Sequence, residues 1–335
     1  MKKINSDVVV CLQNGDSGKG KVTYHLLKTK PYDYCVRFNG GPNAGHTIYH
    51  NGRKFVTHQI PTGVFFGVKS VIGNSCVVDL GRLEEEIKEL QDGGIEVLKY
   101  LKISKRAHII TDCHKADDKD GAGIGSTKRG IGPCYADKAS RTGLRAEHAL
   151  PREWLIDLYE EFTGYDREIN ILFEGAQGFS LDIDYGDYPF VTSSSCTVAG
   201  VLKNGVSWNT IRDVYGTIKA YETYVGAKRF QPDGEIYEKI AKVGKEFGAT
   251  TGRPRQVNWM CLDTIKKAAE INGVNKLIVN KMDVLEIVGA WSAIDNKVMR
   301  TFFGEEGLRR ALQDKLEGIV SDYYYSGNPY TVEGL

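Results

Sequence analysis

A glycine-rich loop between a predicted strand and a predicted helix constrains the fold of this chain more than any other feature. The apolar run at residues 7–12 is rich in Val and typical of a buried strand in a parallel sheet. The loop at residues 15–21 follows it, and residues 22–27 have the pattern of a helix. Because N–H groups at a helix N-terminus bind anions, this order of elements predicts a phosphate-binding loop at the edge of a parallel sheet.

Further segments continue the alternation of strand and helix. Short apolar runs of strand length lie at residues 70–73, 107–110, 171–173 and 276–279. Residues 82–92 and 264–271 show the helical spacing of apolar side chains. The pattern predicts an α/β fold, with a mostly parallel central sheet, flanking helices and long functional loops. No repeat or Pro-rich linker divides the chain, so we expect a single catalytic domain over residues 1–335.

Composition excludes several classes of protein. Hydrophobic residues make up 41% and charged residues 26%, as in soluble globular proteins. The net charge of +1 gives no broad basic field for nucleic acid. The 7 Cys are scattered without a CxxC pair, which favours free thiols in a reducing cytosol. With no signal-peptide run and no membrane-length apolar stretch, we expect a cytoplasmic protein that binds neither nucleic acid nor membranes.

The glycine-rich loop departs from a standard P-loop. Residues 15–21 have the spacing G-x-x-x-x-G-K, but Val22 follows where a P-loop NTPase carries Ser or Thr for magnesium. Asp16 places a carboxylate inside an anion-binding loop. It would be useful there as a magnesium ligand or as a base that removes a substrate proton. Taken alone, the segment is also compatible with a plain glycine-rich turn.

A second nucleotide signal lies far downstream. Residues 279–283 end a predicted strand with the N-K-x-D pattern of GTP-binding proteins. An aspartate at position 283 can accept hydrogen bonds from guanine N1–H and N2–H, which discriminates strongly because another base leaves the carboxylate unpaired. The alternative is a charged helix start after a strand.

Two long loops also suit anion binding. Residues 117–132 and 248–255 combine Gly with Thr and Arg, whose N–H, hydroxyl and guanidinium groups can converge on an anion. Solvated surface loops have similar compositions.

Together these segments resemble the adenylosuccinate synthetase family, from about residue 5 to the C-terminus. The family motif W-G-D-E-G-K-G-K is N-G-D-S-G-K-G-K at residues 14–21, and G-G-x-N-A-G-H-T is matched at residues 40–47. The motif G-T-T-G-R-G-I-G-P is G-S-T-K-R-G-I-G-P at residues 125–133. F-E-G-A-Q-G lies at residues 173–178, and Y-P-F-V-T-S-S follows at residues 188–194.

The resemblance implies the P-loop-like fold of this family and a carbon–nitrogen ligase reaction. A nucleoside triphosphate phosphorylates O6 of a purine nucleotide, and the amino group of L-aspartate then displaces the phosphate. The implied cofactor is Mg²⁺, held by Asp16 and the carbonyl of Gly45. The implied catalytic residues are Asp16 as the base at N1, His46 as the acid at the 6-oxygen, and Gln177.

The same resemblance assigns residues to each ligand. Substrate nucleotide binding falls on Ser17, Asn43, Thr127, Arg141, Gln177, Thr192 and Arg253. L-Aspartate binding falls on Ala249, Thr250, Thr251, Arg253 and Arg255. Binding of the triphosphate donor falls on Gly15, Ser17, Gly18, Lys19, Gly20, Lys21, Thr47, Lys281, Asp283, Ser326 and Gly327. Since Arg141 matches an arginine that reaches the 5′-phosphate in a neighbouring subunit, a homodimer is implied.

The chain departs from the family pattern at several positions, namely Ser17, Pro42, Lys128, Pro254 and Gln256. Ser17 replaces a Glu beside the implied base. With this change the chain resembles the phage-type 2-aminoadenylosuccinate synthases. Those relatives join L-aspartate to dGMP, commonly with ATP, on the route to 2-aminoadenine (diaminopurine) DNA of bacteriophages. Loss of the Glu would make room for a purine 2-amino group, although a retained Glu could also bind that group. We therefore expect dGMP as substrate and ATP as donor, in the host cytoplasm if the protein is phage-encoded.

Two alternatives remain open from the sequence. The first is an ordinary adenylosuccinate synthetase that uses IMP, L-aspartate and GTP, as the N-K-x-D pattern favours. The second is a GTP-binding switch protein, which would need Ser or Thr in place of Val22 and would leave His46 without a role.

Overall fold

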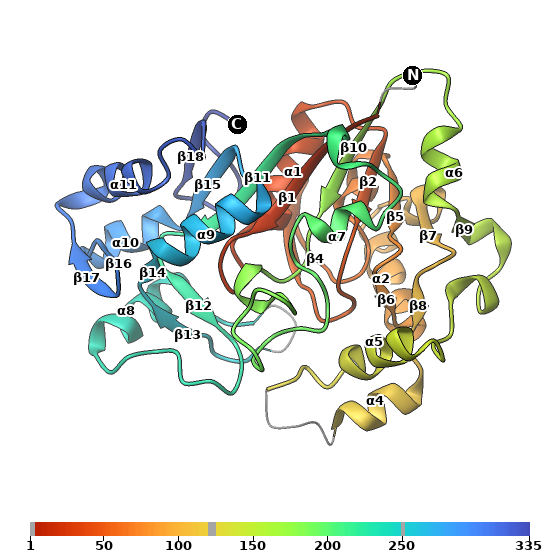
Figure 1. Ribbon diagram of the computed structural model, residues 1–335, viewed down its shortest axis with the longest axis horizontal. Coiled ribbons are helices and arrows are strands. Elements are labelled where there is room, and N and C mark those ends of the chain that lie inside the picture. Colours follow the sequence, from red (N-terminus) through yellow and green to blue (C-terminus); the bar gives the residue numbers. More distant parts are fainter. Residues whose placement is uncertain (1–3, 120–124, 249–251) are drawn as a thin grey trace.

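A nine-stranded parallel sheet forms the centre of the computed structural model, which describes residues 4–119, 125–248 and 252–335 (Figure 1). From one edge to the other the strands are β18 (Asp322–Ser326), β15 (Lys276–Asn280), β11 (Ile211–Lys219), β1 (Ile4–Cys11), β10 (Ile169–Glu174), β2 (Tyr34–Arg37), β5 (Lys69–Ile72), β7 (Leu101–Ser104) and β9 (Leu155–Ile156). Each pair of neighbours is parallel. The predicted α/β fold with a mostly parallel sheet is confirmed.

Helices surround this sheet. The α-helices are α1 (Lys19–Thr29), α2 (Leu80–Gln91), α3 (Val97–Tyr100), α4 (Asp112–Lys119), α5 (Ile131–Ser140), α6 (Leu158–Thr163), α7 (Ala199–Leu202), α8 (Glu235–Gly244), α9 (Leu262–Asn272), α10 (Met282–Val288) and α11 (Gly304–Lys315). Short 3-10 turns are η1 (Thr62–Phe66), η2 (Ala146–His148), η3 (Arg152–Trp154), η4 (Phe179–Leu181) and η5 (Trp208–Thr210). Among the described residues, none of the helices is both long and apolar enough to span a bilayer.

Smaller sheets pack around the central one. Two antiparallel pairs are β3 (His46–His50) with β4 (Arg53–Thr57), and β12 (Glu222–Tyr224) with β13 (Gln256–Asn258). A third sheet contains β14 (Met260–Cys261), β16 (Ser292–Asp295) and β17 (Val298–Thr301). The last pair is β6 (Val77–Val78) with β8 (His108–Ile109).

The structure corrects one expected strand and one expected helix boundary. The apolar run at residues 107–110 yields only the two-residue β8, which pairs with β6 outside the central sheet. The first helix begins at Lys19 rather than Val22, because the last residues of the glycine-rich loop already form the first helical turn. The helices expected at residues 82–92 and 264–271 correspond to α2 and α9.

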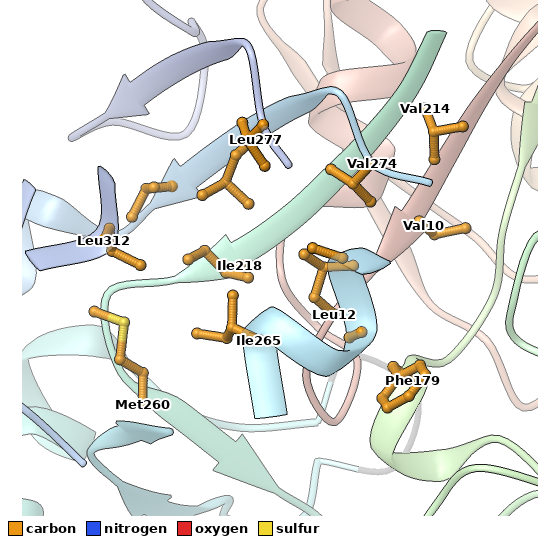
Figure 2. Close-up of a cluster of buried hydrophobic side chains, with 14 of the residues drawn as sticks. Val10, Leu12, Phe179, Val214, Ile218, Met260, Ile265, Val274, Leu277 and Leu312 are labelled. Carbon is orange, nitrogen blue, oxygen red and sulfur yellow. The ribbon is translucent and has the colours of Figure 1, made fainter. Parts of the chain in front are cut away.

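Both faces of the central sheet are buried, which explains its nearly continuous apolar strands. Successive side chains of a strand point to opposite faces. In β1, Val10 packs in one cluster with Ile265 of α9, whereas Val9 packs in another with Val22 of α1. Figure 2 shows the first cluster, in which Ile265 faces strands of the sheet near Ile218.

The strand order positions the loops that matter for function. The strands β10 and β11 lie on opposite sides of β1, and in such a parallel sheet ligands bind beyond the carboxyl ends of the strands where the connections diverge. The glycine-rich loop leaves the carboxyl end of β1, and the N-K-x-D segment leaves the carboxyl end of β15. Both therefore reach the same edge of the sheet.

Replacement of Ile265 tests the packing of α9 on the sheet. Its side chain is completely buried, so Ile265→Ala should lower the free energy of unfolding by about 2–5 kcal/mol, measured by urea denaturation. Ile271 on the same helix is 37% exposed and serves as the control, since Ile271→Ala should cost less than about 1 kcal/mol. Equal losses in the two variants would contradict this packing.

Candidate active site

A pocket of about 1030 Å³ opens at the carboxyl edge of the sheet. This volume is at the upper end of the range for small-molecule sites and suits more than one ligand. Its walls include the glycine-rich loop after β1, the start of β3, the loop after β10 and the N-K-x-D segment after β15. The segments that carry the predicted motifs thus meet around one cavity.

The glycine-rich loop is anchored from the N-K-x-D segment. The side-chain amide of Asn280 donates to the carbonyl of Ser17 at 2.7 Å. Gly18 has φ 90°, and a Cβ there would lie 2.9 Å from Nδ2 of Asn280, so the close approach requires glycine. Val22 is fully buried in the core and offers no hydroxyl for a metal. The loop therefore presents the N-terminus of α1 to an anion without the P-loop metal ligand.

The lysines of the loop point in different directions. Lys19 donates to the carbonyl of Gln177 at 2.5 Å. Lys21 donates to Oγ of Ser326 at 2.6 Å and to the carbonyl of Asn328 at 3.0 Å. Burial lowers the pKa of Lys21 to about 8, although the carboxylate of Asp283 opposes this shift. The ammonium group of Lys19 thus lies near Gln177, and that of Lys21 lies toward Asp283 and the end of β18.

His46 belongs to a buried charged cluster. Its Nδ1 contacts Oε1 of Glu174, which also accepts from Nη2 of Arg37 at 3.1 Å. Burial and the positive charge of Arg37 lower the pKa of His46 to about 4. Burial opposes ionisation of Glu174, yet Arg37 and His46 lower its pKa to about 2. The imidazole is therefore neutral near pH 7, and its Nδ1–H is held by a carboxylate.

Gln177 brings an unsatisfied amide to the pocket. Both polar atoms of its side chain are buried, and neither has a hydrogen-bond partner among the described residues. Its backbone has φ 56°, and a Cβ on Gly40 would lie 2.8 Å from Oε1 of Gln177. Because an unpaired buried amide costs about 1–3 kcal/mol, this group is suited to bind a polar ligand atom.

Asp16 forms an ion pair at the pocket wall. Its Oδ2 lies 3.0 Å from Nη2 of Arg255, whose Nη1 lies 2.5 Å from Oε2 of Glu246. Arg253 in the same loop is exposed, and its Nη1 lies 3.5 Å from the carbonyl of Gly125. The structure therefore brings Arg255, predicted to bind L-aspartate, into contact with the predicted base.

Most of the other predicted residues also line the pocket. They are Gly15, Ser17, Gly20, Asn43, Gly45, Thr47, Thr127, Thr192, Lys281 and Asp283. Ser326 reaches the site through Lys21, and Gly327 lies beside Asp283, where an added Cβ would be 3.5 Å from that of Asp283. Arg141 does not line it; this residue is exposed at the C-cap of α5. Ala249, Thr250 and Thr251 lie outside the described residues.

Several polar residues of the site were missed by the sequence prediction. They are Arg37, Glu174, Glu246 and Asn280. Glu174 and Asn280 stand inside the motifs F-E-G-A-Q-G and N-K-x-D, and each ends a strand. Arg37 also ends a strand. A search for polar residues at strand ends would have found these three, since the carboxyl ends of parallel strands meet at one edge.

Two oxygen donors suit the implied magnesium ion. The carboxylate of Asp16 and the backbone of Gly45 line the same pocket, and Mg²⁺ prefers such hard ligands. The described residues contain no cluster of three or more His, Cys, Asp or Glu side chains able to hold a metal. This sparse donor set fits Mg²⁺, which commonly completes its shell with waters and phosphates.

The fold and the pocket define an α/β protein with a phosphate-binding type of loop and a large pocket at the carboxyl edge of a parallel sheet. A model of the family described as adenylosuccinate synthetase matches residues 8–169 and 160–290. The chain therefore belongs to the adenylosuccinate synthetase family, which are carbon–nitrogen ligases. This membership rejects the alternative of a GTP-binding switch protein.

Individual relatives agree with this assignment. The adenylosuccinate synthetase of Porphyromonas gingivalis is 40% identical over 360 residues, covering 90% of this chain and 84% of the relative. That of Cytophaga hutchinsonii is 42% identical over 334 residues, covering 83% of this chain and 77% of the relative.

Two solved structures are also similar. Fully ligated adenylosuccinate synthetase from Plasmodium falciparum has a TM-score of 0.86 at 28% identity, over 97% of this chain and 98% of that chain. Succinoaminodeoxyadenylate synthetase of cyanophage S-2L, bound to dGMP and dATP, has a TM-score of 0.77 at 21% identity. This match covers 98% of this chain and 94% of that one. The second likeness is one of fold alone.

Removal of the Asn280 amide tests the anchoring of the glycine-rich loop. Asn280→Ala should weaken binding of a nucleoside triphosphate with Mg²⁺ by about tenfold, measured by isothermal titration calorimetry with GTP and ATP as probes, because the loop loses a buried hydrogen bond. Asn275 donates and accepts hydrogen bonds near the opposite end of β15 and provides the control. Asn275→Ala should leave nucleotide affinity within about threefold. Equal weakening by both variants would argue against the anchor.

Proposed function

We propose that this protein joins L-aspartate to C6 of IMP, with GTP as the phosphoryl donor and a 6-phosphoryl nucleotide as the intermediate. The observation that carries the proposal is the meeting of Asp16, His46 and Gln177 at one pocket. These groups match what activation of a purine 6-oxygen requires. The choice of IMP and GTP is supported by the relatives named adenylosuccinate synthetase at 40–42% identity.

Each of the three groups has a defined task in this proposal. Asp16 removes the proton from N1, which makes O6 nucleophilic. The amide of Gln177 binds at the 6-position, where its unpaired polar atoms find partners. Negative charge arriving at the 6-oxygen raises the proton affinity of His46, and Glu174 stabilises the resulting imidazolium. Bound Mg²⁺, held by Asp16 and Gly45, would neutralise charge on the donor phosphates.

Asp283 supports GTP as the donor rather than the ATP expected from the phage-type resemblance. Asp283 lies in the first turn of α10 and lines the pocket. Its charge acts on Lys21, but none of the described residues hydrogen-bonds its carboxylate. Guanine offers N1–H and N2–H as a matched pair of donors for a carboxylate, whereas adenine has no such pair.

The structure gives no support to a selective role of Ser17 at the purine 2-position. Its side chain is completely buried, and its hydroxyl lies 2.6 Å from Oγ1 of Thr217 in β11. The side chain therefore faces the sheet rather than a substrate. This contact does not support the argument that a small residue at position 17 makes room for a 2-amino group.

Another residue, Asn14, supports dGMP as a second candidate substrate. Asn14 lines the pocket two residues before Asp16, at the position where the family motif carries Trp. Its Nδ2 lies 3.5 Å from Oε2 of Glu222. The carbonyl oxygen of the Asn14 side chain can accept from a purine 2-amino group, whereas an indole has no acceptor for it.

Two further features belong to the proposal. Arg141 is exposed and is not among the residues that line the pocket of its own chain, as expected of a residue that completes the site of a second subunit. We infer a homodimer on this ground.

We also infer that residues 1–335 act as one catalytic domain, because the residues of the pocket come from strands across the central sheet.

Turnover with different nucleotide pairs tests the substrate assignment. With L-aspartate and Mg²⁺, kcat/KM should be at least about tenfold higher for IMP with GTP than for dGMP with ATP, measured by succinylated product formation. Asp16→Asn, which removes the proposed base, is the inactive control. Faster turnover of dGMP than of IMP would contradict IMP as the substrate and favour dGMP.

A variant of Asp283 tests the donor. Asp283→Asn should lower kcat/KM for GTP by about a hundredfold and leave that for ATP within about threefold, because the guanine donors lose their acceptor. Glu286 is exposed on the same helix, so Glu286→Gln is the matched control. Equal losses for GTP and ATP in Asp283→Asn would contradict recognition of guanine by this residue.

A further inference from the structure

A buried carboxylate lies at the base of the loop that carries Arg253 and Arg255. Glu246 follows α8, and only 1% of it is exposed. Its Oε1 accepts from the hydroxyl of Tyr221 at 2.5 Å, and both carboxylate oxygens lie 3.2 Å from Nζ of Lys219. Oε2 also lies 2.5 Å from Nη1 of Arg255. Among the described residues, every partner of the Glu246 carboxylate is therefore a donor or a cation.

The environment keeps Glu246 ionised. Burial alone would favour the neutral acid, but the charges of Lys219 and Arg255 lower its pKa to about 2. A buried anion is costly unless it is paired. The Glu246 carboxylate and the cations of Lys219 and Arg255 therefore stabilise one another's positions.

Glu246 contacts only the Nη1 group of the Arg255 guanidinium, and Arg255 also lines the pocket. Nη2 of Arg255 lies 3.0 Å from Oδ2 of Asp16. Nε of Arg255 is buried, with no hydrogen-bond partner among the described residues. The Nε–H and Nη2 groups form the donor fork that binds a carboxylate bidentately. In this structure only half of that fork is used.

The backbone reinforces the same arrangement. The N–H of Arg255 donates to the carbonyl of Glu246 at 3.0 Å, and the N–H of Gly248 donates to the carbonyl of Arg253 at 2.8 Å. Phe247 and Pro254 form an antiparallel bridge between these bonds. The two sides of the loop are thus paired at its base, next to Glu246.

Glu246 also connects this loop to the central sheet. Lys219 is the last residue of β11, and its Nζ donates to Oγ1 of Thr223 at 2.5 Å. The strand β11 pairs with β1, whose following loop carries Asp16. Glu246 therefore contacts both Lys219 at the end of β11 and Arg255, which in turn contacts Asp16.

We propose that Glu246 is a positioning residue for the L-aspartate site, where it holds the Arg255 guanidinium beside Asp16 with the Nε–H left unpaired for a substrate carboxylate. The identity of the ligand rests on the proposed function, whereas the placement of the fork does not. A merely structural Glu246 would change stability, kcat and all KM values together. A positioning residue changes the KM for L-aspartate selectively.

The experiment compares Glu246→Gln with Glu238→Gln, an exposed position on α8. In Glu246→Gln the KM for L-aspartate should rise at least about tenfold, while the KM values for both nucleotides stay within about threefold. Glu238→Gln should behave like the wild type. Tyr221→Phe removes one hydrogen bond from Glu246 without a charge change, and it should raise the KM for L-aspartate in the same direction but less. An unchanged KM for L-aspartate, or an equal rise of all three, overturns the proposal.

Crystal structures of the unliganded variants separate this inference from the proposed function. If the wild type shows no L-aspartate-dependent turnover with IMP or dGMP, the proposed function fails. The positioning role is then decided by the contact between Arg255 and Asp16, which should persist in Glu238→Gln and be lost in Glu246→Gln. If Glu246→Gln does not fold, Tyr221→Phe takes its place, with a displaced Arg255 side chain as the expected result. An Arg255 that keeps its wild-type position overturns the proposal.

Discussion

The central sheet buries both of its faces, and this constraint determines where the polar groups of the site can lie. Helices cover the two faces, as Ile265 of α9 and Val22 of α1 illustrate. Polar side chains that serve a ligand are therefore left to the ends of the strands. All nine strands are parallel, so their carboxyl ends share one edge, and the loops after β1, β10 and β15 form a single pocket there.

Charges buried at this edge are paired with one another. Glu174 holds His46 and Arg37 on one side of the pocket, and Glu246 holds Arg255 on the other. Burial makes each carboxylate dependent on its cations. The side chains that would meet substrate are thereby oriented in advance, which lowers the ordering that binding would otherwise require. Gln177 differs from these groups, because both polar atoms of its buried amide lack a partner among the described residues.

Much of this arrangement could be predicted from the sequence because it depends on local order. The glycine-rich loop and the N-K-x-D segment both follow apolar strands, so their presence at one edge follows from a parallel sheet. The anchor between Asn280 and Ser17 could not be predicted, since it joins residues 263 positions apart. The direction of the Ser17 side chain depends on Thr217 in a neighbouring strand. Apolar content alone likewise could not place β8, which pairs outside the central sheet.

The sequence by itself determined the α/β fold, the family and the set of residues around the phosphate-binding loop. These features depend on short motifs and on the alternation of strand and helix, and both are formed by residues that lie close together in the sequence. Only the tertiary structure decided that Arg255 contacts Asp16, that Glu246 supports Arg255, and that Ser17 faces the sheet. The reason is that each of these contacts joins separate strands or loops, and buried charges and hydroxyls select partners by proximity in space rather than by position in the sequence.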